Sequence, residues 1–92
     1  MKITWRPRAA DDFEQLIEMS SAGNIANASR DKSLLENRIL QLVKFDQLGR
    51  KSRRIGVREL PIEGTPYVVV NRRMDDELLI LRIFHNGKAT LS

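Results

Sequence analysis

Three short apolar segments in the second half of the chain constrain its fold more than any other feature. Residues 55–60, 67–71 and 78–84 are rich in branched apolar side chains, and turn-forming residues separate them at 61–64 and 74–76. Segments of this kind, joined by only a few residues, are typical of β-strands that pair in antiparallel order. We therefore expect a three-stranded meander in this half of the chain.

The first half of the chain is expected to supply one strand and two helices. Residues 2–5 alternate polar and apolar side chains, as a short strand does. Apolar residues at helical spacing predict one helix over about 8–20 and a second over about 25–45. Asn24 is the expected cap of the second helix, and Gly49 is expected to close that unit.

The connection between the two helices is short, which predicts an antiparallel helix hairpin. The residues of the first helix that are expected to point outward are Asp12, Gln15 and Glu18. The expected fold class is α+β. It combines an amino-terminal strand, an antiparallel two-helix hairpin and a three-stranded antiparallel meander in one sheet, within a single domain of residues 1–92.

Positive charge is concentrated between the second helix and the meander. The whole chain has a formal net charge of +4, whereas residues 44–58 alone carry +5 because Asp46 is the only acid among them. The basic residues of this segment are Lys44, Arg50, Lys51, Arg53, Arg54 and Arg58. One interpretation is a solvated, mobile surface loop. The other is a site that attracts phosphates or an acidic polypeptide.

The last predicted strand, residues 78–84, is mostly apolar on both of its faces. Successive side chains of a strand point to opposite sides, and two helices cover only one face of a sheet. The other face then requires cover from a partner, from the basic loop or from a second copy of the chain. The remaining alternative is a central strand that is buried within the monomer.

Composition excludes several kinds of site. The chain has no cysteine and a single histidine, His85, so a metal site would depend on carboxylates alone. We therefore expect no metal and no cofactor. The chain begins without the apolar segment of a signal peptide and contains no apolar run of membrane-spanning length. These features predict a cytoplasmic protein with no membrane partner.

Short motifs, taken with the order of the expected elements, give the chain a resemblance to a known family. The motifs are Ile3-Thr4-Trp5, Arg58-Glu59-Leu60 and Pro66-Tyr67. In this arrangement the chain resembles the RelE/ParE superfamily of bacterial toxins, and more closely its ParE branch. The resemblance covers nearly the whole chain.

The resemblance implies a toxin of a type II toxin–antitoxin pair, neutralised by a cognate ParD-like antitoxin with an acidic carboxyl-terminal segment. ParE-like toxins poison DNA gyrase by stabilising its cleaved-DNA complex, and they are not themselves catalysts. DNA gyrase is therefore the implied target. The residues expected to bind the target or the antitoxin are Arg50, Lys51, Arg53, Arg54 and Arg58.

An alternative is a RelE-like, ribosome-dependent mRNA endonuclease that works without a metal. Such cleavage needs a cation and proton-transfer groups around one phosphate. The candidates for these roles are Arg58, Arg82 and His85.

Several features depart from the RelE pattern. Val68 stands where RelE-like nucleases hold a phosphate-binding arginine, and the paired lysines and the carboxyl-terminal tyrosine of RelE are missing. Arg82 and His85 are three residues apart, so a regular strand points them to opposite faces. A third hypothesis, from another class, is a small basic nucleic-acid adaptor with no toxin role.

Overall fold

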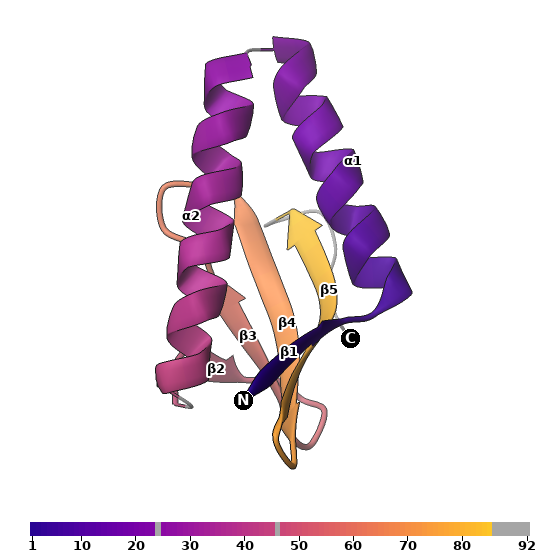
Figure 1. Cartoon of the computed structure of the whole chain (residues 1–92), viewed down its shortest axis with the longest axis vertical. Helices are drawn as coiled ribbons and strands as arrows, with labels where there is room; N and C mark the ends of the chain where they lie inside the picture. The colour runs from indigo at the N-terminus through magenta and orange to yellow at the C-terminus, as the bar shows by residue number, and fades with distance from the viewer. Residues whose placement is uncertain (24, 46, 86–92) are drawn as a thin grey trace.

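The computed structural model describes residues 1–23, 25–45 and 47–85, in which two helices pack on one side of a five-stranded sheet (Figure 1). In chain order the elements are β1 (Lys2–Trp5), α1 (Pro7–Gly23), α2 (Ile25–Lys44), β2 (Arg50–Lys51), β3 (Val57–Pro61), β4 (Tyr67–Met74) and β5 (Glu77–His85). The strand order is β1-β5-β4-β3-β2. The expected α+β class is confirmed.

The sheet is mixed, and it has one strand more than the sequence predicted. β1 runs parallel to β5, whereas β5, β4, β3 and β2 pair with their neighbours in antiparallel order. The additional strand is β2, which lies inside the segment that was expected to be an irregular basic loop. It forms because Arg50 pairs with Glu59 and Lys51 pairs with Arg58 on the edge of the meander.

α1 and α2 lie side by side, run in opposite directions and cover one face of the sheet (Figure 1). The core lies between the helices and this face. Its buried members are Ala9, Leu16, Leu35, Ile39, Leu42, Leu60, Ile62, Tyr67, Val69, Leu78, Ile80 and Ile83. The expected helix cap, Asn24, lies outside the described residues.

Gly49 has a different role from the one that the sequence predicted. α2 ends at Lys44, so Gly49 does not terminate it. Its φ of +85° lies in the region that favours glycine, and a Cβ atom there would lie 2.6 Å from the carbonyl oxygen of Glu59. Gly49 therefore allows the chain to approach β3 closely, immediately before β2.

β5 lies between β1 and β4 and is therefore a central strand over its first half. Leu78 and Ile80 belong to the core beneath the helices, and Leu79, on the opposite face, is also buried. Of the alternatives that the sequence left open, burial within the chain holds for these three residues.

The second half of β5 changes register at a β-bulge. The pairing of β4 with β5 shifts between Val70 and Asn71, and this shift leaves Leu81 as the extra residue of β5. A bulge reverses the faces to which the following side chains point. Ile83 accordingly joins the core, whereas Arg82 pairs with Val70 on the opposite face.

Candidate functional site

Two of the five basic residues expected to bind a partner make contacts within the chain. Arg50 Nε donates a hydrogen bond to Glu59 Oε1 at 3.2 Å, between paired residues of β2 and β3. Arg58 donates to the carbonyl oxygen of Gly49 at 3.3 Å and to Gln47 Oε1 at 3.0 Å. Both side chains therefore hold the connection after α2 against β3.

The loop between β2 and β3 is closed by hydrogen bonds. The Ser52 N–H donates to the carbonyl oxygen of Val57 at 3.0 Å, and the Val57 N–H donates to that of Arg54 at 3.1 Å. Ser52 Oγ accepts a hydrogen bond from the Arg54 N–H at 3.0 Å and donates to the carbonyl oxygen of the same residue at 3.2 Å. These bonds fix the direction in which the side chains of the loop leave the backbone.

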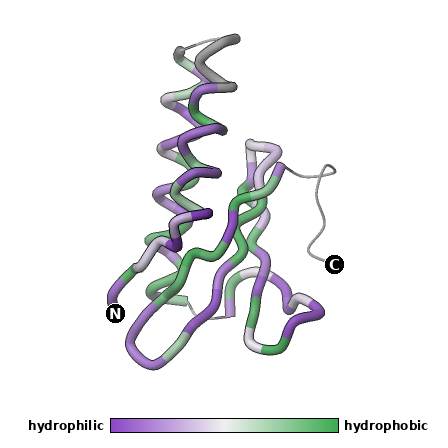
Figure 2. Tube along the Cα trace, turned by 90° about the vertical axis from the view of Figure 1, so that its right-hand side faces the viewer, coloured by the Kyte–Doolittle hydropathy of each residue, from purple (hydrophilic) through white to green (hydrophobic). Residues whose placement is uncertain are grey.

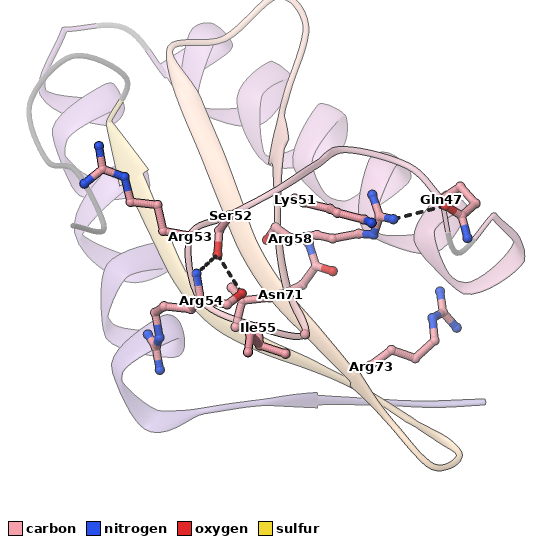
Figure 3. A pocket seen from close by; sticks show the side chains of 11 residues that line it. Gln47, Lys51, Ser52, Arg53, Arg54, Ile55, Arg58, Asn71 and Arg73 are labelled. Carbon is pink, nitrogen blue, oxygen red and sulfur yellow. Dashed lines mark hydrogen bonds between the residues drawn. The ribbon is translucent and has the colours of Figure 1, made fainter.

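Lys51, Arg53 and Arg54 carry the uncompensated charge of this loop. All three are exposed, and among the described residues none of them has a carboxylate within ion-pair distance. They border a depression of about 530 Å³, and none of the described residues that line it is acidic (Figure 3). An arrangement of this kind attracts anions.

Asp12 holds Arg82 in a two-pronged ion pair. Arg82 Nε donates to Asp12 Oδ2 at 2.8 Å, and Arg82 Nη2 donates to Oδ1 at 3.1 Å. Asp12 Oδ2 also accepts the backbone N–H of Ile83 at 2.9 Å, where β5 extends beyond its pairing with β1. The hydrogen bonds to Asp12 raise the pKa of the Arg82 guanidinium above its ordinary value, against the opposing effect of burial.

The prediction that Asp12 points outward is therefore wrong. Its side chain is only 15% exposed. The physical reason is that β5 continues past the end of β1, which leaves an edge N–H that needs an acceptor. Helix α1 packs against this edge and supplies the carboxylate.

A second depression, of about 400 Å³, lies next to the first. Its lining combines arginines from three parts of the chain, namely Arg6, Arg8, Arg54 and Arg82. Arg54 lines both depressions. Arg6 and Arg8 were not among the site residues predicted from the sequence, because no local pattern shows that the start of α1 lies close to the loop between β2 and β3.

The three residues considered for nuclease chemistry lie at separate places. Arg58 pairs with Asn71, whereas His85 pairs with Tyr67, four residues away along β4. The His85 ring packs edge-on against the Tyr67 ring, with centroids 5.8 Å apart. Arg82 lies on the opposite face of the sheet from His85. The structure therefore does not bring these side chains together around one phosphate.

Two classes of site receive no support from the described residues. No group of His, Cys, Asp or Glu in residues 1–23, 25–45 and 47–85 could hold a metal ion. Neither helix of this part of the chain is long and apolar enough to cross a membrane.

Solved structures with the same fold include bacterial toxins. A chain of the chromosomal ParDE toxin–antitoxin system from P. aeruginosa superposes with a TM-score of 0.84 at 26% identity, covering 95% of this chain and 97% of that one. The isolated E. coli RelE toxin gives a TM-score of 0.67 at 8% identity, with 98% and 88% covered, and this likeness shows the fold alone. A conserved hypothetical protein from Helicobacter pylori gives 0.50 at 26% identity, with 90% and 91% covered.

No curated protein sequence matches the chain significantly. Residues 3–89 match the family described as the ParE toxin of the type II toxin–antitoxin system parDE. This match extends over almost all of the described strands and both helices, and it agrees with the structural likeness to a ParDE system. The chain belongs to the ParE toxin family of type II toxin–antitoxin systems.

Proposed function

We propose that this ParE toxin inhibits DNA gyrase in the bacterial cytoplasm, and that it does so by binding rather than by catalysis. The supporting observation is the placement of the three candidate catalytic residues. Arg58 and Arg82 are engaged in hydrogen bonds within the chain, and His85 packs against Tyr67 on another part of the sheet. Metal-free RNA cleavage requires a cation and a proton donor at the same phosphate.

The surface that contacts the target in this proposal is the loop between β2 and β3. Lys51, Arg53 and Arg54 are its exposed cations without carboxylate partners among the described residues. Arg50 and Arg58 support the loop from within, because their side chains bind Glu59 and the segment after α2. The five basic residues thus divide into three that face a partner and two that position them.

The antitoxin that accompanies a ParE toxin is proposed to be ParD-like, with an acidic carboxyl-terminal segment that folds on binding. Two large apolar side chains are exposed near the carboxyl end of α2, Leu40 at 58% and Phe45 at 59%. An amphipathic segment that is disordered on its own would bury them. Its acidic residues would complement the net positive charge of the toxin.

Induced expression in bacteria with parallel readouts tests the target. A gyrase poison is expected to induce the DNA-damage response and, with purified gyrase, to accumulate cleaved DNA. A ribosome-dependent nuclease would instead cut mRNA at ribosome-bound codons within minutes. Rapid mRNA cleavage without gyrase-dependent DNA breaks would contradict the proposal.

Charge reversal tests whether the loop is the contact surface. The double variant Arg53→Glu/Arg54→Glu is expected to lose growth inhibition while its melting temperature stays close to the wild-type value, because both residues are exposed. The matched control is Lys2→Glu/Lys32→Glu, which makes the same change in net charge at exposed positions away from the loop. If both double variants lost toxicity equally, net charge alone would explain the effect and the loop would have no special role.

A further inference from the structure

Ile55 is an apolar side chain held out at the tip of a basic loop. It is 92% exposed, far more than any other large apolar residue among those that the structure describes. Its neighbours in the chain, Arg53 and Arg54, are also exposed. Single exposed apolar residues are common on proteins, so exposure alone carries no conclusion.

The backbone of Ile55 is fixed from the sheet beneath it. Arg72 Nη2, from β4, donates a hydrogen bond to the Ile55 carbonyl oxygen at 3.1 Å. Gly56 follows with a φ of +79°, so the chain turns back directly after Ile55. Together with the hydrogen bonds of Ser52, these contacts hold the loop in one shape. The backbone of the loop therefore holds the Ile55 side chain in a defined, exposed position.

The loop projects from the sheet on the side away from the helices, and Figure 2 shows a hydrophobic bend in it beside a strongly hydrophilic stretch. Arg54 connects this tip to the second depression, where Arg6 and Arg8 lie. In Figure 3 the side chains of Arg53 and Arg54 extend toward β5, away from Lys51 and Arg58.

Four arginines lie along this surface: Arg53 and Arg54 precede Ile55 in the loop, and Arg6 and Arg8 line the second depression together with Arg54. None of Arg6, Arg8, Arg53 and Arg54 makes an ion pair with a described residue. Bringing like charges together is unfavourable unless an anion joins them. The arginines come from the start of α1 and from the loop between β2 and β3, so their charge extends over a surface rather than around one pocket. This spacing suits a polyanion with repeated phosphates.

We propose that this surface binds duplex DNA directly, with Ile55 inserted as an apolar wedge in the minor groove and the four arginines on the flanking phosphates. Minor-groove binders use the same combination, in which an aliphatic side chain partly unstacks a base step and basic residues hold the backbone. A single-strand platform needs aromatic side chains for base stacking, and no aromatic residue of the described part of the chain lines either depression. The proposal rests on gyrase inhibition as the function, and it adds that the toxin touches the DNA as well as the enzyme.

Such insertion gives a physical reason for the stabilisation of a cleaved complex. A wedge beside the broken step holds the base pairs apart and bends the helix, so the two ends are displaced from the geometry needed for rejoining. The arginines supply affinity that does not depend on sequence. Sequence preference would then come from how easily a step opens, and flexible pyrimidine–purine steps would be favoured.

The test measures binding and bending of a short DNA duplex by purified toxin without gyrase, through anisotropy and end-to-end energy transfer at several salt concentrations. The variant Ile55→Ser is expected to lose about tenfold in affinity and most of the bend, while the dependence on salt stays unchanged. The control, Met74→Ser, removes another exposed apolar side chain and is expected to behave as wild type. The variant Arg6→Glu/Arg54→Glu is expected to reduce the salt dependence, by about 0.9 in the log–log slope for each phosphate that the variant no longer binds.

The outcomes separate this inference from the proposed function. If wild-type toxin binds no duplex at low salt, or if Ile55→Ser binds and bends DNA as wild type does, the wedge is overturned even though gyrase poisoning stands. If the loop variants lose only antitoxin binding, the surface recognises a protein and the DNA contact is overturned. Gyrase-dependent DNA cleavage by wild-type toxin, measured separately, decides the proposed function alone.

Discussion

At the scale of single residues, Asp12 shows why a helix of this chain carries an acid on its inner side. The carboxylate binds the Arg82 guanidinium through two hydrogen bonds and also accepts the N–H of Ile83. It therefore satisfies a strand edge that β1 is too short to cover. Asp12 and Arg82 are seventy residues apart in the sequence. Helical periodicity considers only the residues of one helix, so it could not reveal this partner and predicted an outward-facing Asp12.

We predict that Asp12→Ala destabilises the fold by about 2–3 kcal/mol, because it leaves a partly buried guanidinium and a backbone N–H without their acceptor. In a domain of this size each kcal/mol lowers the melting temperature by about 4–8 °C. Thermal unfolding followed by circular dichroism measures the change. Asp11→Ala is the matched control, since Asp11 is exposed and has the same charge. Equal effects of the two substitutions would contradict the structural role of Asp12.

A second residue-scale prediction concerns Gly49. Both Gly49→Ala and Gly56→Ala place a side chain at positive φ, which costs about 1–2 kcal/mol. At Gly49 the new Cβ also meets the backbone oxygen of Glu59, whereas at Gly56 it meets only the flexible side chain of Arg72 at 3.5 Å. Denaturant unfolding is expected to show Gly49→Ala as the less stable variant by at least about 1 kcal/mol. The reverse order would mean that β2 does not need to approach β3 closely.

At the scale of elements, the sequence predicted the helices and strands that have periodic apolar residues. It did not predict the strand residues that are extended only because they pair with a neighbouring strand. Both helices and four of the five strands follow from the pattern of apolar residues alone. β2 does not, because Arg50 and Lys51 have no strand-like composition and extend only by pairing with the edge of β3. β4 continues three residues beyond its predicted end for a similar reason, since Arg72 and Arg73 pair with Leu79 and Leu78 despite their charge.

The end of β5 supports a prediction about His85. We expect His85→Ala to leave growth inhibition within about threefold of wild type, because the contact of this ring with Tyr67 is one of packing. A nuclease that used His85 to transfer a proton would lose about a hundredfold or more. Growth inhibition and gyrase-dependent DNA cleavage are the measurements.

The companion variant His85→Phe separates packing from proton transfer. It keeps an aromatic edge against Tyr67 and is expected to recover the stability of about 0.5–1.5 kcal/mol that the alanine variant loses. Loss of toxicity in both variants, with folding and antitoxin binding intact, would favour proton transfer by His85 and the nuclease alternative.

At the scale of the whole molecule, the sequence predicted only part of the candidate site. The charge of residues 44–58 identified the loop, since a run of cations without acids is a local property. The sequence did not show which arginines of the loop make contacts within the chain. Arg50 and Arg58 differ from Arg53 and Arg54 only in the hydrogen bonds that they make in the folded structure. Arg6 and Arg8 join the site through tertiary contacts that no local pattern encodes.

The arrangement of the molecule also predicts that the antitoxin and the target bind on opposite sides of it. A chain of 92 residues buries only about 60–65% of its unfolded surface, so an antitoxin that covers more apolar area would stabilise it. Leu40 and Phe45 offer that area at the end of α2, in the helical layer, whereas the loop between β2 and β3 projects from the opposite side of the sheet (Figure 2). We therefore expect that mutation can separate antitoxin binding from toxicity.

We predict that Leu40→Asp/Phe45→Asp weakens antitoxin binding by at least about a hundredfold while toxicity is retained. Burial of such side chains contributes about 1.5–3 kcal/mol each, and a carboxylate in their place also repels an acidic segment. Calorimetric titration measures the affinity, and hydrogen exchange on the complex should show protection of α2. Met74→Asp, at another exposed apolar position, is the control and should bind normally. Protection confined to residues 50–58, with α2 unprotected, would instead place the antitoxin on the basic loop, and neutralisation would then be direct competition for the toxic surface.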